Sequence, residues 1–142
     1  MSASVREARS DAEIERCHPV MHQLRGHVPL EGFVARVRRQ AGQGYRLACV
    51  EDGGRVVAVA GFYLRENLPD GRHVHVDDLV TDEACRSAGH GALLLGWLEA
   101  LAREAGCQAL TLESGVQRFA AHRFYLRQRM EIRSHHFVLP LA

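Results

Sequence analysis

The first half of the chain alternates between hydrophobic spacings typical of helices and of strands. Residues 11–24 carry apolar side chains at helical spacing, and Pro19 within them is expected to kink or split that helix. A second amphipathic helix is expected from Leu30 to near Gly42. Apolar runs at residues 45–51 and 55–64 flank Asp52-Gly53-Gly54, which predicts an antiparallel hairpin with a bulge at Gly61.

The second half alternates single strands with helices. A polar loop at residues 66–71 precedes a strand and a long apolar helix that ends near Ala105, with Gly106 as its C-terminal cap. With a short first strand at residues 5–9, the predicted order is β-α-α-β-β-β-α-β-α-β. This order predicts a mixed α/β fold (an α+β mixed sheet) that begins as an antiparallel meander and contains one parallel pair. The remaining expected elements are strands at 73–80, 109–114 and 133–139 and a helix at 117–127.

Composition narrows the class of protein. A length of 142 residues predicts one domain spanning residues 1–142. The net charge of +1 argues against nucleic-acid binding through a broad basic surface. Every basic residue apart from histidine is arginine, so lysine nucleophiles are excluded. The sequence has no signal-peptide pattern, no apolar run long enough to span a membrane and no CxxC pair among its four cysteines. We therefore expect a cytoplasmic protein whose cysteines are reduced.

The stretch from Val74 to Ala102 holds the strongest functional pattern. The strand ends at Val80, a short polar turn follows, and Arg86-Ser-Ala-Gly89-His-Gly91 opens the long helix. The first N–H groups of a helix have no intrahelical partner, and the helix dipole adds partial positive charge there. Glycines let a phosphate approach the backbone closely, and Arg86 adds a fixed positive charge. The pattern therefore predicts an anion site.

This stretch resembles the acetyl-CoA loop of the GNAT acyltransferases, whose pattern is Arg/Gln-x-x-Gly-x-Gly/Ala. The order of elements resembles the same family over the whole chain. The resemblance implies an N-acetyltransferase that uses acetyl-CoA and no metal. It further implies that two parallel strands splay apart, that the backbone of the first holds the pantetheine arm, and that the loop holds the pyrophosphate. The cofactor-binding residues implied are Leu79, Val80 and Thr81 for the arm and Arg86, Ser87, Ala88, Gly89, His90, Gly91 and Ala92 for the pyrophosphate.

A second match to the family lies in the helix at residues 117–127. Ala120-Ala121-His122-Arg123-Phe124-Tyr125 resembles its Ala-x-x-Phe-Tyr pattern, which implies that Tyr125 protonates the departing CoA thiolate. The alternative is a tyrosine that only packs the helix onto the sheet. The Gly-Phe pair usual in the family is Arg129-Met130 here, and Ser114 stands where many members have an asparagine near the cofactor arm.

The general base is sought on the strand at residues 73–80. By the two-residue strand period, His73, His75 and Asp77 share one face and Asp78 lies on the other. His75 is the first choice because an unperturbed histidine has a pKa of about 6.5. Asp77 and Glu113 are the alternative candidates for the general base. It also remains open that this polar face has no catalytic role.

Two rival functions stay open. His73-Val-His75-Val-Asp77-Asp78 resembles the His-x-His-x-Asp-His zinc motif of metallo-β-lactamase-type hydrolases but ends in Asp, which would make the protein a metal-dependent hydrolase. A non-catalytic module that senses CoA or a nucleotide would keep the phosphate loop without depending on Tyr125. The dinucleotide-binding fingerprint fits poorly because its third glycine is missing.

The sequence does not identify the acceptor amine. Glu31, Glu66 and Asp70 could attract a cationic amine, although solvated surface charge explains them equally. A small amine, an amino acid, an aminoglycoside-like molecule and a protein amine all remain open. The family resemblance also makes a homodimer a reasonable expectation.

Overall fold

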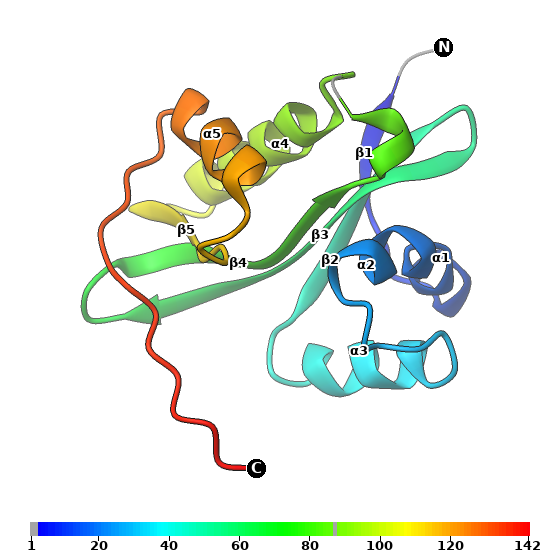
Figure 1. The fold of residues 1–142 in the computed structure, drawn as a ribbon, viewed down its shortest axis with the longest axis horizontal. Helices are drawn as coiled ribbons and strands as arrows, with labels where there is room; N and C mark the ends of the chain where they lie inside the picture. The colour runs from blue at the N-terminus through cyan, green and yellow to red at the C-terminus, as the bar shows by residue number, and fades with distance from the viewer. Residues whose placement is uncertain (1–2, 87) are drawn as a thin grey trace. The chain divides into compact units, whose positions relative to one another are not determined.

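The computed structural model describes residues 3–86 and 88–142 and contains one five-stranded sheet in the order β1-β2-β3-β4-β5 (Figure 1). The chain divides into two compact units, residues 1–111 and 112–142. In the described residues, no helix is both long and apolar enough to cross a membrane. The elements are β1 (Ser4–Glu7), α1 (Asp11–Arg16), α2 (His18–Leu24), α3 (Phe33–Ala41), β2 (Arg46–Asp52), β3 (Arg55–Asn67), β4 (Gly71–Thr81), a 3-10 turn (Glu83–Cys85), α4 (His90–Glu104), β5 (Ala109–Leu112) and α5 (Phe119–Arg127).

Strands β1 to β4 form the predicted antiparallel meander, and β4 and β5 form the predicted parallel pair. The β2–β3 hairpin closes at Asp52 and Arg55 through Gly53 and Gly54, which both have positive φ. The next hairpin closes between Asn67 and Gly71. The loop expected at residues 66–71 is therefore only a tight turn, because both strands extend beyond their apolar runs.

The first helical segment splits as Pro19 suggested. Pro19 occupies the first turn of α2, where its missing N–H costs no helical hydrogen bond, and Cys17 separates α2 from α1. The third helix begins at Phe33 instead of Leu30, because Gly32 precedes it in the left-handed region at φ 80°. Three N-terminal helices therefore replace the two expected.

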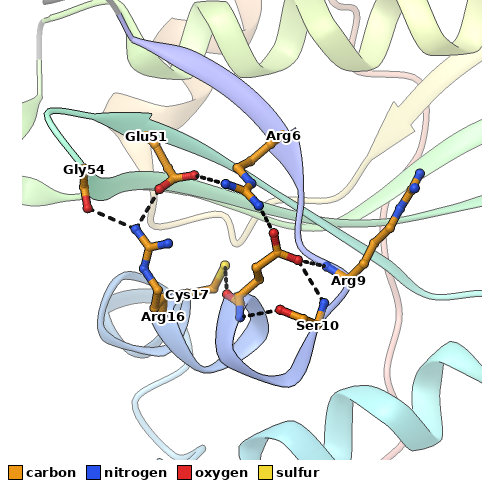
Figure 2. Close-up of polar contacts among 8 residues, drawn as sticks. Arg6, Arg9, Ser10, Arg16, Cys17, Glu51 and Gly54 are labelled. Carbon is orange, nitrogen blue, oxygen red and sulfur yellow. Dashed lines mark hydrogen bonds and ion pairs between the residues drawn. The ribbon is translucent and has the colours of Figure 1, made fainter.

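A polar network fixes α1 to the first two strands (Figure 2). Ser10 and Glu13 form a capping box, in which the Ser10 hydroxyl accepts from the Glu13 N–H at 3.1 Å. Glu51 on β2 accepts from Arg6 on β1 at 3.1 Å and from Arg16 on α1 at 2.6 Å. Arg6 and Arg16 thus connect β1 and α1 with β2.

Apolar side chains cover both faces of the sheet in the first unit. Helices α1 to α3 pack with Leu47, Val59 and Val80 on one face. On the other face α4 packs against β3 and β4, burying Leu94, Leu95 and Leu98 (Figure 1). This packing holds β4 and the start of α4 in a fixed relation, which is what positions the candidate site.

The strand expected at residues 133–139 is wrong, because residues 130–142 form no helix or strand. Its β-branched and aromatic residues favour a strand locally, but a strand needs a neighbour to accept its backbone hydrogen bonds. In the last helix, Phe119 and Leu126 are exposed, and Tyr125 is the buried residue of α5.

Candidate active site

The predicted anion loop lies between β4 and α4. Gly89 is the N-cap of α4 at φ 82°, a conformation that other L-residues rarely adopt, and no side chain among the described residues caps the helix there. Apart from its chain neighbours, no atom of the described residues lies within 4 Å of the position of a Cβ on Gly89. The helix is 15 residues long. Its unpaired N–H groups and its dipole fit a phosphate group.

The other predicted loop residues have distinct surroundings. Arg86, Ala88 and Ala92 are exposed, whereas Gly91 is partly exposed. Ser87 lies outside the described residues. The His90 side chain is buried, with its Nε2 3.9 Å from Oδ2 of Asp52, the last residue of β2.

The β4 strand continues past the end of its parallel neighbour. Gln108 donates its N–H to the Arg72 carbonyl, and Thr111 bonds to His75, so β5 lies alongside the first half of β4. β5 ends at Leu112. Leu79, Val80 and Thr81 pair with β3 on one side. On the other side they run beyond β5, which is the last strand of the sheet in the described part of the chain.

A polar cluster forms on the β4 face that α4 does not cover. His75 pairs with Tyr63, whose ring lies 5.5 Å from that of Tyr45, and the Tyr45 hydroxyl donates to Asp78 at 2.7 Å. Arg25, at the end of α2, donates its Nε–H to the other Asp78 oxygen at 2.8 Å. Helix α2 is thereby tied to the centre of β4.

The placement of Asp78 corrects the alternation predicted for this strand. The β3–β4 register shifts at Gly61/Phe62, so Asp78 lies opposite Gly61 and Val76 opposite Phe62. Asp77 is the additional residue of this β-bulge. The bulge, which the sequence indicated at Gly61, breaks the two-residue period and turns Asp78 to the same face as His75.

Within this cluster His75 and Asp77 lie close together. The His75 Nδ1 lies 2.7 Å from the Thr111 hydroxyl, and its Nε2 lies 3.5 Å from Asp77 Oδ1. The His75 side chain is 10% exposed and that of Asp77 is 41% exposed. Burial and the adjacent Asp78 carboxylate raise the pKa of Asp77 above its usual range. The contact with Thr111 and the partnership with Asp77 were not evident from the sequence.

The geometry of His73 does not fit the metal-ligand pattern. Arg65 donates to His73 Nε2 at 3.0 Å, and His73 Nδ1 lies 2.8 Å from the Gly71 carbonyl oxygen. Both ring nitrogens are therefore engaged. Among residues 3–86 and 88–142, no group of three or more His, Cys, Asp or Glu side chains could hold a metal ion.

In the second unit, Tyr125 is buried on α5, and burial raises the pKa of its phenol although Arg118 opposes that shift. The end of α5 adopts a Schellman motif, in which Met130 N–H donates to the Tyr125 carbonyl at 3.1 Å. Arg129 occupies the left-handed position at φ 69°, where glycine is common. Although Arg129-Met130 replaces the Gly-Phe pair that is usual in the family, α5 still ends in this motif. The backbone of Arg129 is strained as a result.

Ser114 is an informative residue of this unit, because its hydroxyl oxygen is buried without a hydrogen-bond partner in the part of the chain that the structure describes. A buried unpaired hydroxyl is unfavourable and fits a position that contacts a ligand.

Glu113, an alternative candidate for the general base, is exposed and pairs with His136 Nδ1 at 2.8 Å.

The bulge also makes Gly61 sensitive to substitution. A Cβ at this position would overlap the Tyr45 hydroxyl and lie 2.6 Å from Asp78 Oδ2. We expect Gly61→Ala to break the Tyr45–Asp78 hydrogen bond and to lower the free energy of unfolding by about 2 kcal/mol, measured by urea denaturation. Gly96→Ala, at an open position on α4, is the matched control and should not destabilise the protein. Equal stability of the two variants would contradict the expected overlap.

These features define an α/β protein in which β4 runs past the end of β5 and is followed, after a loop that contains the 3-10 turn, by the N-terminus of α4, which no described side chain caps. The family model described as "Acetyltransferase (GNAT) family" matches residues 6–129. The chain belongs to the GNAT family of acetyltransferases, and the protein is an acyltransferase of that family. The family that the sequence resembled is therefore confirmed.

Named relatives and solved structures agree with this assignment. The uncharacterized N-acetyltransferase YhdJ of Bacillus subtilis is 33% identical over 122 residues, covering 85% of this chain and 86% of that protein. The aminoalkylphosphonate N-acetyltransferase of Salmonella typhimurium is 30% identical over 113 residues, covering 79% and 71%. The structure of AAC(6')-Iy with a CoA-containing bisubstrate analog matches with a TM-score of 0.86 at 11% identity, covering 100% and 99%, which shows a shared fold.

Proposed function

We propose that the protein transfers an acetyl group from acetyl-CoA to a primary amine, which attacks the thioester directly in a ternary complex. The observation that carries the proposal is the strand edge at Leu79–Thr81 leading into the uncapped N-terminus of α4. The chain would act as a single acetyltransferase domain, located in the cytoplasm, as a homodimer.

The residues present fit acetyl-CoA as a substrate. Backbone groups of Leu79, Val80 and Thr81 would bond the pantetheine arm. The pyrophosphate would be held by the backbone N–H groups of the first turn of α4 and by the Arg86 guanidinium. The orphaned Ser114 hydroxyl would gain a partner from the arm. The remaining pyrophosphate-binding positions proposed are Ser87, Ala88, Gly89, His90, Gly91 and Ala92.

Acetyl transfer forms a bond between the amine nitrogen and the carbonyl carbon and breaks the bond from that carbon to sulfur. The amine loses a proton in this step, and the departing thiolate gains one. A backbone N–H near Val80 would stabilise the charge on the carbonyl oxygen. Tyr125 would supply the proton to sulfur, because its raised pKa keeps the phenol protonated at neutral pH.

The amine proton would be taken by His75. If Nδ1 donates its hydrogen to the Thr111 hydroxyl, Nε2, which lies 3.5 Å from Asp77 Oδ1, is the nitrogen that would accept the amine proton. Asp77 would then stabilise the imidazolium that forms, because its carboxylate lies 3.5 Å from Nε2. Asp77 is also the more exposed of the two, so it would be the first to contact an incoming amine.

The acceptor class remains broad. The names of two relatives describe N-acetylation of glucosamine 6-phosphate and of aminoalkylphosphonates, which are amines that carry a phosphate or phosphonate group. We propose that an acceptor screen begin with such small primary amines. Amino acids, an aminoglycoside and peptide amines would complete the panel.

Calorimetric titration of the purified, metal-free protein with acetyl-CoA tests the proposal, with zinc as the control ligand. We expect micromolar binding of acetyl-CoA and none of zinc. Release of free CoA with any amine of the panel would then demonstrate transfer. Zinc binding without acetyl-CoA binding would overturn the proposal, and acetyl-CoA binding without transfer to any amine would favour the sensing module.

The roles of His75 and Asp77 can be separated by their pH profiles. We expect His75→Gln to lower kcat roughly a hundredfold and to remove the acidic limb of the profile. Asp77→Asn should lower kcat less and move that limb to lower pH, because loss of the carboxylate makes the imidazolium less stable. Glu104→Gln, at the exposed end of α4, is the control and should leave kcat unchanged. If Asp77→Asn removes the limb and His75→Gln does not, Asp77 is the base.

A further inference from the structure

The polar face that carries His75 continues onto the neighbouring strand β3. Tyr63 on β3 pairs with His75 across the hairpin, and the next pair on the same face is Arg65 with His73. The rings of His73 and His75 lie 6.4 Å apart. Two residues of a strand span about 7 Å, so Arg65 lies roughly that far along the sheet from the proposed base.

The guanidinium of Arg65 is held in place without being neutralised. Its Nε donates to His73 Nε2 at 3.0 Å, and the His73 side chain is fully buried, so the contact fixes the direction of the guanidinium. An imidazole carries no negative charge, and within the described residues no carboxylate forms an ion pair with Arg65. The side chain is exposed, so its two terminal nitrogens are available for a bidentate contact with an oxyanion.

The Asp78 carboxylate on the same face does not compete for this charge. Arg25 donates to one Asp78 oxygen at 2.8 Å, and the Tyr45 hydroxyl donates to the other at 2.7 Å. The charge of Asp78 is therefore balanced locally by Arg25.

The charges that stay unbalanced have opposite signs and lie on opposite sides of His75. Asp77 follows His75 along β4, and it pairs with no arginine in the part of the chain that the structure describes. Arg65 lies on the other side, opposite His73. Burial raises the pKa of Asp77, and Arg65 is among the cations that oppose this shift, so its field extends to the carboxylate. The face is therefore polar along its length, negative at Asp77 and positive at Arg65.

We propose that the acceptor is a small primary amine that also carries an oxyanion, either a carboxylate or a phosphonate, and that Arg65 binds this oxyanion. The cationic amine approaches Asp77 and gives up its proton to His75, while the oxyanion lies against the guanidinium. The short distance between the two ends limits the acceptor to one whose oxyanion is only a few bonds from the nitrogen. Arg65 stays protonated throughout and determines specificity without taking part in bond making. This inference rests on the proposed acetyl transfer and names the acceptor class for it.

Steady-state kinetics with acceptors of similar length test the inference on the wild type. Aminoethylphosphonate and β-alanine carry an oxyanion, whereas propylamine is their neutral counterpart. We expect kcat/KM to be at least tenfold higher for one of the two anionic amines than for propylamine, and the better of the two identifies the oxyanion. Transfer to all three amines with equal kcat/KM would overturn the inference and leave the proposed function intact. Failure to transfer to any amine of the wider panel would overturn both.

Substitution of Arg65 tests the contact itself. We expect Arg65→Gln to raise the KM of the preferred anionic amine roughly thirtyfold, with kcat and the KM of acetyl-CoA nearly unchanged, because the lost contact acts on binding alone. The kinetics with propylamine should not change. Arg65→Lys should recover part of the affinity because it retains the charge.

Arg39→Gln is the matched control for the loss of one positive charge. Arg39 is exposed on α3, so this variant should keep the kinetics of the wild type with every amine. Circular dichroism and thermal unfolding verify that each variant is folded. A loss in Arg65→Gln that is equal for propylamine and the anionic amine would show that Arg65 only supports His73, and would overturn the inference.

Discussion

Gly89→Leu is expected to weaken acetyl-CoA binding at least a hundredfold, which corresponds to about 3 kcal/mol. Gly89 has φ 82°, and a leucine in this conformation costs roughly 1–2 kcal/mol of backbone strain. Its side chain would also occupy the open space beside the first turn of α4, where we place the pyrophosphate. Calorimetric titration with acetyl-CoA measures the loss directly.

Gly96→Leu is the matched control for this substitution. Gly96 lies on the same helix and is exposed, and a Cβ added to it would have no neighbouring atom within 4 Å, but its φ is ordinary. We expect unchanged affinity and a gain in stability of roughly 0.5–1 kcal/mol, because leucine is the better helix former. If Gly89→Leu binds acetyl-CoA as tightly as this control does, the loop does not hold the phosphates.

Tyr125→Phe is expected to lower kcat roughly a hundredfold and to leave the affinity for acetyl-CoA nearly unchanged. The substitution removes only the hydroxyl that we propose as the proton donor to sulfur. Burial raises the pKa of this phenol, so it stays protonated as the pH rises through the neutral range. The alkaline limb of the wild-type kcat profile should therefore lie above a pH of about 10 and should vanish in the variant.

Phe124→Leu separates this acid role from simple packing. The Phe124 ring lies 5.6 Å from that of Tyr125, so the change alters the packing around the phenol and retains its hydroxyl. We expect this variant to keep a turnover close to that of the wild type. Unchanged turnover in Tyr125→Phe would remove Tyr125 from the mechanism and leave it a packing residue.

Several features could be read from the sequence because each depends on its immediate neighbours. Pro19 marked the division between α1 and α2, and Gly106, at φ 73°, lies just beyond the end of α4. The glycines after Val80 marked the loop, and the order of elements indicated the family that the comparisons confirmed. In each case a local backbone restriction or a short motif carries the information.

Other features depend on contacts between distant residues. The turn of Asp78 toward His75 follows from a bulge opposite Gly61, and the contacts of Asp78 with Arg25 and Tyr45 join residues 53 and 33 positions apart. The contact of His75 with Thr111 likewise spans 36 positions. A strict two-residue period contains no information about such a register shift.

The sequence by itself determined the family, the mixed sheet and the position of the loop between β4 and α4, because these follow from local spacing and backbone restrictions. The tertiary structure alone decided which polar groups surround His75, that β4 extends past β5, and that residues 133–139 pair with no strand in the part of the chain that the structure describes. All of these features depend on which strands and side chains pair with one another in the fold. A strand preference is local, but the hydrogen bonds that satisfy it come from whichever neighbour the fold supplies.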